Sequence, residues 1–192
     1  LSRDTMCKIR LFDSEGNDLG WDKQHLGLAY SYGKNRKHGG ILAKDAVSKL
    51  LSDVPLVNYT AFDLNSLQEL QDIIGDMPMV LDDDYIDINP LWKKGKKIVI
   101  NRDNVEEFVR SRNTSKDYSN KTRMQRQKLY IQTYINQLKT QLTNDYSTTL
   151  QKMYNFYSKL TTNITLKEID SYAEMILNYS IDNNEYYTLP GE

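Results

Sequence analysis

Short runs that favour strands alternate with helical repeats through the first half of the chain, and this alternation limits the folds open to it. Apolar residues recur every three or four positions from Gly40 and predict a helix that ends before Pro55. Runs rich in β-branched, aromatic and other apolar residues predict strands at residues 1–13, 56–62, 77–81 and 96–100. Strands alternating with helices are typical of an α/β fold, in which helices cover a sheet.

Further helices are predicted from apolar spacing and from signals at helix ends. Asn65 and Gln68 form a capping-box pattern for one helix, and Gly75 is placed to end it. Beyond Arg123, apolar residues at helical spacing predict three more helices, around residues 134–142, 150–160 and 169–177. We therefore expect a layered αβα sandwich with a central mixed sheet and a helical C-terminal portion. A chain of 192 residues fits one domain, 1–192, with a sizeable core.

Fixed positive charge is concentrated in one window, FVRSRNTSKDYSNKTRMQRQ at 108–127. Four of the eight arginines of the chain lie there, although the formal net charge of the whole chain is -1. The near-neutral total argues against a general nucleic-acid binder, because such proteins usually carry a basic excess over the whole domain. A local group of guanidinium side chains instead suits an anion such as phosphate.

Arg110 and Arg112 are two positions apart within this window. In an extended chain such residues project from the same face, whereas on a helix they diverge by about 200°. Because the preceding short helix should end here, we expect both arginines on an extended exit, aimed at one spot. The alternative is a solvated loop between two elements.

Arg123 and Arg126, followed by Gln127, open the long helix that comes next. Unpaired backbone N–H groups and the positive end of the helix dipole favour an anion at such a position. Arginines there oppose the dipole unless an anion offsets them, which indicates a ligand. The alternative is an exposed helix start whose charges are hydrated.

Arg3 and Asp4 form a second candidate pair near the start of the chain. At the end of a strand, such a pair could hold and orient an anion. The alternative is a plain surface ion pair, worth less than about 1 kcal/mol.

Other patterns indicate no site. The acidic run at 82–87 lacks the glycine and glutamate of a calcium-binding EF-hand loop, so we interpret it as a solvated turn. GKNRKHGG at 33–40 lacks the ending of a phosphate-binding loop and is predicted to be a flexible surface loop. His25 and His38 have no partner at a spacing used for nucleophilic catalysis. Cys7 is the only cysteine, which excludes an internal disulfide, and two histidines are too few for a usual zinc cluster.

Several stretches, taken in order, resemble the motifs of the LytR-CpsA-Psr family, whose members occur on the outer face of the cytoplasmic membrane in Gram-positive bacteria. The match runs over nearly the whole chain, and the ordered combination is more specific than any single stretch. The stretches are SRDT at 2–5, LGLAYSYG at 26–33, VPLVNYTAFDLNSLQELQDIIGD at 54–76, FVRSR at 108–112, RMQRQ at 123–127 and TTNIT at 161–165.

This resemblance implies an extracytoplasmic enzyme that moves a glycopolymer, of the teichoic acid or capsular polysaccharide type, from a polyprenyl pyrophosphate carrier to peptidoglycan. In that family arginines grip the pyrophosphate, Mg²⁺ helps to neutralise it, and the lipid tail lies in an apolar tunnel. Phosphoryl transfer depends mostly on the placement of charge, so guanidinium groups without a histidine triad suit it.

The resemblance also implies roles for individual residues. Asp4 would orient a guanidinium group or the acceptor hydroxyl, and Gln127 would add a polar contact to the pyrophosphate. The residues implied in catalysis are Arg3, Asp4, Arg110 and Arg112. The residues implied in pyrophosphate binding are Arg3, Arg110, Arg112, Arg123 and Gln127.

The chain departs from the family pattern at a few positions. Ser2 stands where the family commonly has proline, and Asn120 and Thr122 replace an aspartate and a glycine. Asp117 is a candidate for the displaced acid. The two aspartates that bind Mg²⁺ in the family precede the Arg-Asp-Thr motif. We therefore expect the N-terminal strands and the metal ligands to lie upstream of this chain, which would hold no metal by itself.

Two other classes of function stay open at this point. One is a non-catalytic binder of polyprenyl-linked or polyanionic cell-wall polymer. The other is a transcription regulator, against which the near-neutral charge and the lack of a recognisable helix-turn-helix weigh. For the leading hypothesis the expected partners are the lipid-linked glycopolymer, peptidoglycan and the membrane, reached through an anchor outside this chain, with no nucleic acid.

Overall fold

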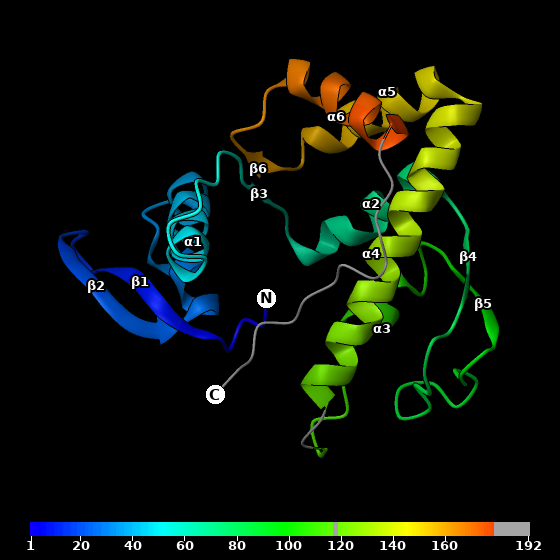
Figure 1. Cartoon of the computed structure of the whole chain (residues 1–192), viewed down its shortest axis with the longest axis horizontal. Helices are drawn as coiled ribbons and strands as arrows, with labels where there is room; N and C mark the ends of the chain where they lie inside the picture. The colour runs from blue at the N-terminus through cyan, green and yellow to red at the C-terminus, as the bar shows by residue number, and fades with distance from the viewer. Residues whose placement is uncertain (117–118, 179–192) are drawn as a thin grey trace. The chain divides into compact units, whose positions relative to one another are not determined.

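Figure 1 shows the computed structural model of the chain, which describes residues 1–116 and 119–178. The chain divides into two compact units. Among the described residues, unit 1 comprises Leu1–Phe62 and Leu160–Thr165, and unit 2 comprises Asp63–Lys159 and Leu166–Asn178. The single domain that we expected over 1–192 stays a prediction.

Unit 1 begins with an antiparallel hairpin of β1 (Met6–Phe12) and β2 (Asp18–His25), in which Met6 is paired with His25. The side chains of β1 alternate, so that Cys7 and Ile9 are buried in one core cluster with Ala29 and Ala46. The strand expected at 1–13 is thus confirmed over Met6–Phe12, and Cys7 is a packed residue. β2 was not predicted, because most of its side chains are exposed and show no apolar alternation.

Helix α1 (Arg36–Leu50) packs against β1 and follows the short 3₁₀ helix η1 (Leu26–Tyr32) (Figure 1). It begins within the segment 33–40, so our prediction of a flexible loop there is wrong. Asn35 caps the helix by accepting a hydrogen bond from the backbone N–H of His38 at 3.0 Å. A Cβ atom on Gly40 would lie 2.3 Å from the ring of Tyr59, so glycine is needed for close packing.

Strands β3 (Thr60–Ala61) and β6 (Thr161–Thr162) form a short ladder in unit 1. Polar side chains of the TTNIT stretch extend it. Asn163 accepts at Oδ1 from the N–H of Tyr59 at 2.8 Å and donates from Nδ2 to the carbonyl of Val57 at 3.0 Å. The strand expected at 56–62 is therefore shorter than predicted, because hydrogen bonds from the side chain of Asn163 take the place of backbone pairs at Val57 and Tyr59.

Unit 2 contains one further ladder and most of the helices (Figure 1). The helices that we predicted after Gly40 are all present, although their boundaries differ by a few residues. The elements are η2 (Leu64–Ser66), α2 (Leu67–Ile74), β4 (Met77–Val80), β5 (Lys97–Ile100), α3 (Val105–Arg110), α4 (Ser119–Asn144), α5 (Tyr146–Tyr157) and α6 (Leu166–Asn178).

The ends of α2 show one wrong and one correct expectation. The capping box of Asn65 and Gln68 is wrong, because Asp63 lies at the N-cap of the preceding η2 turn and accepts at Oδ1 from the N–H of Ser66 at 3.1 Å. Gly75 does end the helix, with a φ of 70° that L residues rarely adopt.

The α/β class is confirmed, since both units combine helices with strands. The strands in the described part of the chain pair as three two-stranded sheets, all antiparallel, where we had expected one mixed sheet. Antiparallel pairs can close through a short turn, as between β1 and β2, whereas parallel pairs need a long crossover. Across the described residues, no helix combines the length and the apolar character needed to cross a membrane.

Candidate functional site

Arg110 and Arg112 lie at the exit of α3 in unit 2, but in different backbone environments. Arg110 is the last residue of α3 and forms an ion pair with Glu106, one turn earlier. Arg112 follows Ser111, whose φ of -61° and ψ of 141° are extended. The expected extended exit therefore holds for Arg112 only. The reason is local, because a basic residue in the last turn interacts favourably with the helix dipole and with an acid four residues before it.

Two side chains of α4 hold the backbone of this exit. Arg126 donates from Nε to the carbonyl of Phe108 at 2.8 Å and from Nη2 to the carbonyl of Ser111. Gln127 donates from Nε2 to the carbonyl of Val109 at 3.1 Å. The last carbonyls of a helix have no partner within the helix, so these donors from α4 cap the C-terminal end of α3.

Arg126 is buried, with a relative exposure of 1%, and its guanidinium group lies over the ring of Tyr85, 5.5 Å from its centroid. Burial lowers the pKa of Arg126 from its ordinary value, and neighbouring Arg123 acts in the same direction. Burial likewise raises the pKa of Tyr85, and so does its hydrogen bond to Asp82 at 2.5 Å. Tyr85 is therefore a neutral hydroxyl donor beside a buried cation.

A cavity of about 250 Å³ opens beside Arg112. Its wall carries charges of both signs, and Lys116 forms an ion pair with Asp87 at 2.6 Å. We call it the Arg112 cavity, and its lining residues are Asp84, Tyr85, Asp87, Ile88, Arg112, Asn113, Lys116, Thr122 and Arg126. Such a cavity can receive an anionic group together with neighbouring hydroxyl groups.

Arg123 and Gln127 are positioned by the first turns of α4. Arg123 donates from Nη2 to Oδ1 of Asn120 at 2.6 Å. Because Asn120 is a neutral acceptor, this hydrogen bond does not neutralise the charge of Arg123. Asp117, the candidate for the displaced acid, lies outside the described residues.

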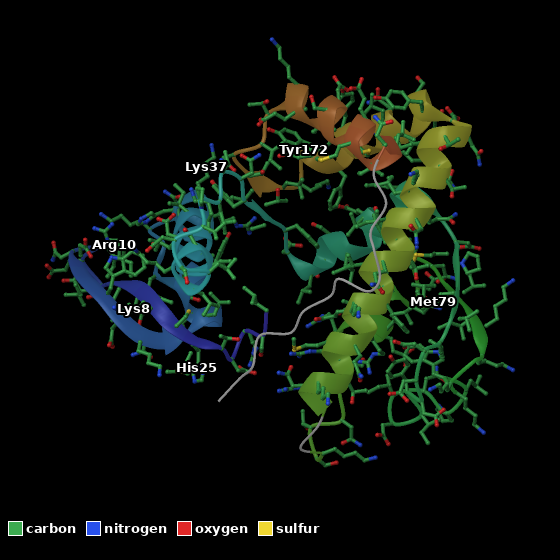
Figure 2. All side chains as sticks on the ribbon, in the orientation of Figure 1. Lys8, Arg10, His25, Lys37, Met79 and Tyr172 are labelled. Atoms are coloured by element: carbon green, nitrogen blue, oxygen red, sulfur yellow. The ribbon has the colours of Figure 1, made fainter. Side chains whose placement is uncertain are left out.

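Arg3 and Asp4 lie in unit 1, just before β1. Arg3 Nε and Asp4 Oδ1 are 3.4 Å apart, and the two side chains are 68% and 50% exposed. The N–H of Gly27 donates to the carbonyl of Arg3 at 2.8 Å. His25, which is labelled in Figure 2, has its Nδ1 3.0 Å from the carbonyl of Asp4. The SRDT stretch therefore rests against the start of the LGLAYSYG stretch. This backbone contact of His25 was not predicted.

The structure thus brings four of the six predicted site residues to the α3 exit and the first turns of α4. That these four and the Arg3–Asp4 pair form one site stays a prediction. Sequence reasoning missed the structural role of Arg126. A signal was present, since Arg126 lies four residues before Tyr130 and eight before Tyr134, on the stripe of α4 that is buried.

The described residues do not fit a metal ion. Within the described part of the chain, no group of three or more histidine, cysteine, aspartate or glutamate side chains could hold one. The Mg²⁺ that the family resemblance implies therefore stays a prediction, with its ligands expected upstream.

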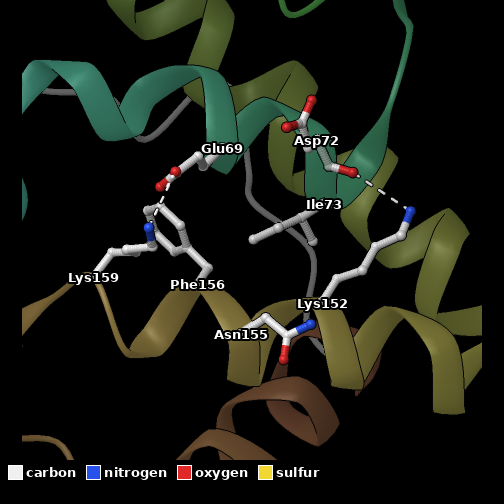
Figure 3. A pocket seen from close by; sticks show the side chains of 7 residues that line it. All are labelled: Glu69, Asp72, Ile73, Lys152, Asn155, Phe156 and Lys159. Carbon is white, nitrogen blue, oxygen red and sulfur yellow. Dashed lines mark hydrogen bonds and ion pairs between the residues drawn. The ribbon is translucent and has the colours of Figure 1, made fainter.

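A second cavity, of about 310 Å³, lies between α2 and α5 (Figure 3). Ile73 and Phe156 form its apolar floor. Charged groups stand at its two ends, where Lys159 is 3.3 Å from Glu69 and Lys152 donates to the carbonyl of Asp72 at 3.4 Å. The described residues that line it include none of the predicted site residues.

Comparison with known proteins gives one family and several solved structures. The model of the LytR_cpsA_psr family matches residues 1–192. No curated protein matches the chain. The Lin1025 protein from Listeria innocua is 22% identical, with a TM-score of 0.61, and the match covers 93% of this chain and 66% of that one.

Two further structures show the same fold. B. subtilis TagV is 16% identical, with a TM-score of 0.69 and coverage of 94% of this chain and 65% of that one. TagT bound to LI-WTA is 20% identical, with a TM-score of 0.61 and coverage of 92% of this chain and 60% of that one. The chain thus spans between 60% and 66% of the length of these three structures.

Proposed function

The chain belongs to the LytR-CpsA-Psr family, and from this we propose that it attaches a cell-wall glycopolymer, carried on polyprenyl pyrophosphate, to peptidoglycan. The observation that carries the proposal is the α3 exit. There, side chains of α4 hold the backbone on both sides of Arg110, and Arg112 lines a cavity whose wall carries charges of both signs. Rigidly placed guanidinium groups are what a phosphoryl transfer needs, because its catalysis consists mostly of positioning and charge stabilisation.

In the proposed reaction an acceptor hydroxyl of peptidoglycan attacks the phosphorus that bears the glycopolymer. A new phosphodiester bond forms, the P–O bond within the pyrophosphate breaks, polyprenyl phosphate leaves, and the hydroxyl proton is released to solvent. Charge builds up on the leaving phosphate. The guanidinium groups proposed to stabilise that charge are Arg3, Arg110, Arg112 and Arg123.

Asp4 and Gln127 have supporting roles in this proposal. The carboxylate of Asp4, which is half exposed, would orient the guanidinium group of Arg3 or the acceptor hydroxyl. The amide nitrogen of Gln127 carries two hydrogens, of which one is directed at the carbonyl of Val109. The second can therefore donate to a pyrophosphate oxygen.

The proposed substrate and location follow from the family and from one neighbour. TagT, which shares the fold, has been solved with LI-WTA bound, and this supports a lipid-linked wall polymer as the ligand here. We propose the extracytoplasmic face of a Gram-positive cell membrane as the place of action, with an anchor outside this chain. Mg²⁺ is part of the proposal as the cofactor that the family resemblance implies.

A non-catalytic binder of the same polymer is the second candidate, because the described residues offer no fitting set of metal ligands. Incubating the protein and Mg²⁺ with labelled lipid-linked glycopolymer and peptidoglycan separates the two. Transfer of label to peptidoglycan supports the enzyme, and binding without transfer supports the binder. Solvent extraction of the purified protein, followed by mass spectrometry, should detect polyprenyl phosphates in either case. Duplex DNA binding that weakens steeply with salt, without any lipid, would contradict both.

A further inference from the structure

We propose that Arg126 is a positioning residue that fixes the backbone from which Arg112 enters the cavity; this inference rests on the proposed function. Arg126 was not among the residues expected to touch the pyrophosphate. Its contacts point to an indirect role, through Ser111 and Phe108.

Of the two hydrogen bonds, the one to Ser111 bears more directly on the position of Arg112. The carbonyl of Ser111 belongs to the peptide unit that joins Ser111 to Arg112. A donor held on this oxygen restricts rotation on both sides of that unit, and with it the direction in which the side chain of Arg112 departs. The second donor, on the carbonyl of Phe108 at 2.8 Å, fixes the last turn of α3 relative to the same guanidinium group.

The shape of the guanidinium group explains why arginine occupies this position. Nε and Nη2 are rigidly joined, so they hold two carbonyls that are three residues apart in a fixed geometry. A lysine at 126 would present one flexible ammonium group, which could reach only one of the two carbonyls in a defined direction. Lysine would therefore keep the charge and lose the pair of hydrogen bonds to Phe108 and Ser111.

Burying this cation without an ion-paired carboxylate is costly unless other groups compensate. In the described part of the chain, no ion pair includes Arg126, and its partners are the negative end of the α3 dipole and the ring face of Tyr85. A buried apolar residue would fill the same space at lower cost. The retained charge is therefore explained by the hold on the α3 exit.

Amide hydrogen exchange on Arg126→Lys tests directly whether Arg126 fixes the backbone of the α3 exit. The amides of Phe108 and Ser111, which donate to the carbonyls of Asn104 and Glu107, should exchange at least tenfold faster in the variant. Amides of α4 beyond Tyr130 should keep their protection. Arg102→Lys, an exposed arginine of the same unit paired with Asp72, is the matched control and should leave all of these rates unchanged.

A double-mutant cycle on inorganic pyrophosphate binding tests whether Arg126 acts through Arg112. Arg126→Lys and Arg112→Ala should each weaken binding at least tenfold, and the double variant should bind no more weakly than Arg112→Ala alone. Losses that multiply in the double variant would overturn the proposal, as would unchanged exchange at Phe108 and Ser111. If the unaltered protein does not bind pyrophosphate, the proposed function is contradicted. The exchange rates at Phe108 and Ser111 then still show whether Arg126 fixes the backbone of the α3 exit.

Tyr85→Leu provides a second variant should Arg126→Lys fail to fold. It removes the ring face under the guanidinium group and leaves both donors of Arg126 in place. Faster exchange at Ser111 than in the unaltered protein supports this role of Arg126. Unchanged exchange at Ser111 in a folded Tyr85→Leu protein contradicts it.

Discussion

The hydroxyl of Tyr130 donates to Oε1 of Gln71 at 2.9 Å, and both residues are buried. The amide nitrogen of Gln71 in turn donates to the carbonyl of Gly75 at 2.7 Å and lies 3.4 Å from that of Ile100. One buried glutamine thus connects α2, β5 and α4. Its partner in α4, Tyr130, lies one helical turn after Arg126. This network fixes the position of α4, which in turn holds the α3 exit.

Tyr130→Phe is expected to lower the free energy of unfolding by about 1–2 kcal/mol, because it leaves a buried acceptor of Gln71 without its donor. Burial raises the pKa of Tyr130, so the hydroxyl stays protonated over the usual pH range and the loss should not depend on pH. Denaturant unfolding measures the effect. Tyr32→Phe is the control, since among the described contacts the hydroxyl of Tyr32 makes no hydrogen bond, and its change should stay within about 0.5 kcal/mol.

Gly75→Ala is expected to destabilise the protein through backbone strain alone. Gly75 has φ 70° and ψ -148°, a region that is almost restricted to glycine. A Cβ atom there would meet nothing within 4 Å, so crowding does not contribute. The expected cost is about 1–3 kcal/mol in chemical denaturation. Asp76→Ala, at the exposed neighbouring position, should change stability by less than about 0.5 kcal/mol, and an equal loss in both variants would contradict the explanation.

Sequence patterns were sufficient where a side-chain period determined the element. The apolar stripes of α4, α5 and α6 and the short runs of β4 and β5 needed no tertiary information. β2 could not be found in this way, because its fold depends on pairing with β1 and few of its side chains are covered. The start of α1 was hidden for a related reason. Gly39 and Gly40 are poor helix formers, and glycine is needed at these positions because Tyr30 and Tyr59 approach the helix closely.

The candidate site shows the same limit. A cluster of arginines could be located from the sequence, but not the part that each one plays. Arg110 and Arg126 carry identical groups, yet one is half exposed and paired with Glu106, and the other is buried on backbone carbonyls. Burial and partner identity come from tertiary packing, which the spacing of residues in the window does not specify.

The β1–β2 turn is expected to weaken in acid because of Asp13. Asn17 donates from its side chain and its backbone to the carboxylate of Asp13, and these bonds lower the pKa of Asp13 below its ordinary value of 3.8. A carboxylate with a lowered pKa stabilises the fold above its unfolded pKa, and this contribution is lost as the pH falls through the folded pKa. The turn should therefore keep its full stability above about pH 5 and lose it below 3.8.

Amide exchange of β1, followed from pH 5 downward and corrected for intrinsic rates, measures this effect on the turn. Asp13→Asn keeps an acceptor oxygen and removes the titrating group, so its hairpin should show a weaker dependence on pH. Asp76→Asn, which alters an acid of unit 2, is the control and should follow the unaltered protein. The same acid dependence in Asp13→Asn would show that another group is responsible.

Arg112→Ala and Arg110→Ala are each expected to reduce glycopolymer transfer by about 10²–10³, the usual effect of removing one donor that stabilises transition-state charge. The unfolding free energy should change by no more than about 0.5 kcal/mol, because both side chains project from the surface of the α3 exit. Arg102→Ala is the matched control, since its side chain is 51% exposed and ion-paired, as that of Arg110 is 46% exposed and ion-paired. Arg102→Ala should keep full transfer.

If transfer and the thermal midpoint fall together in Arg112→Ala, this arginine stabilises the fold. The assignment of pyrophosphate binding to the α3 exit would then be wrong.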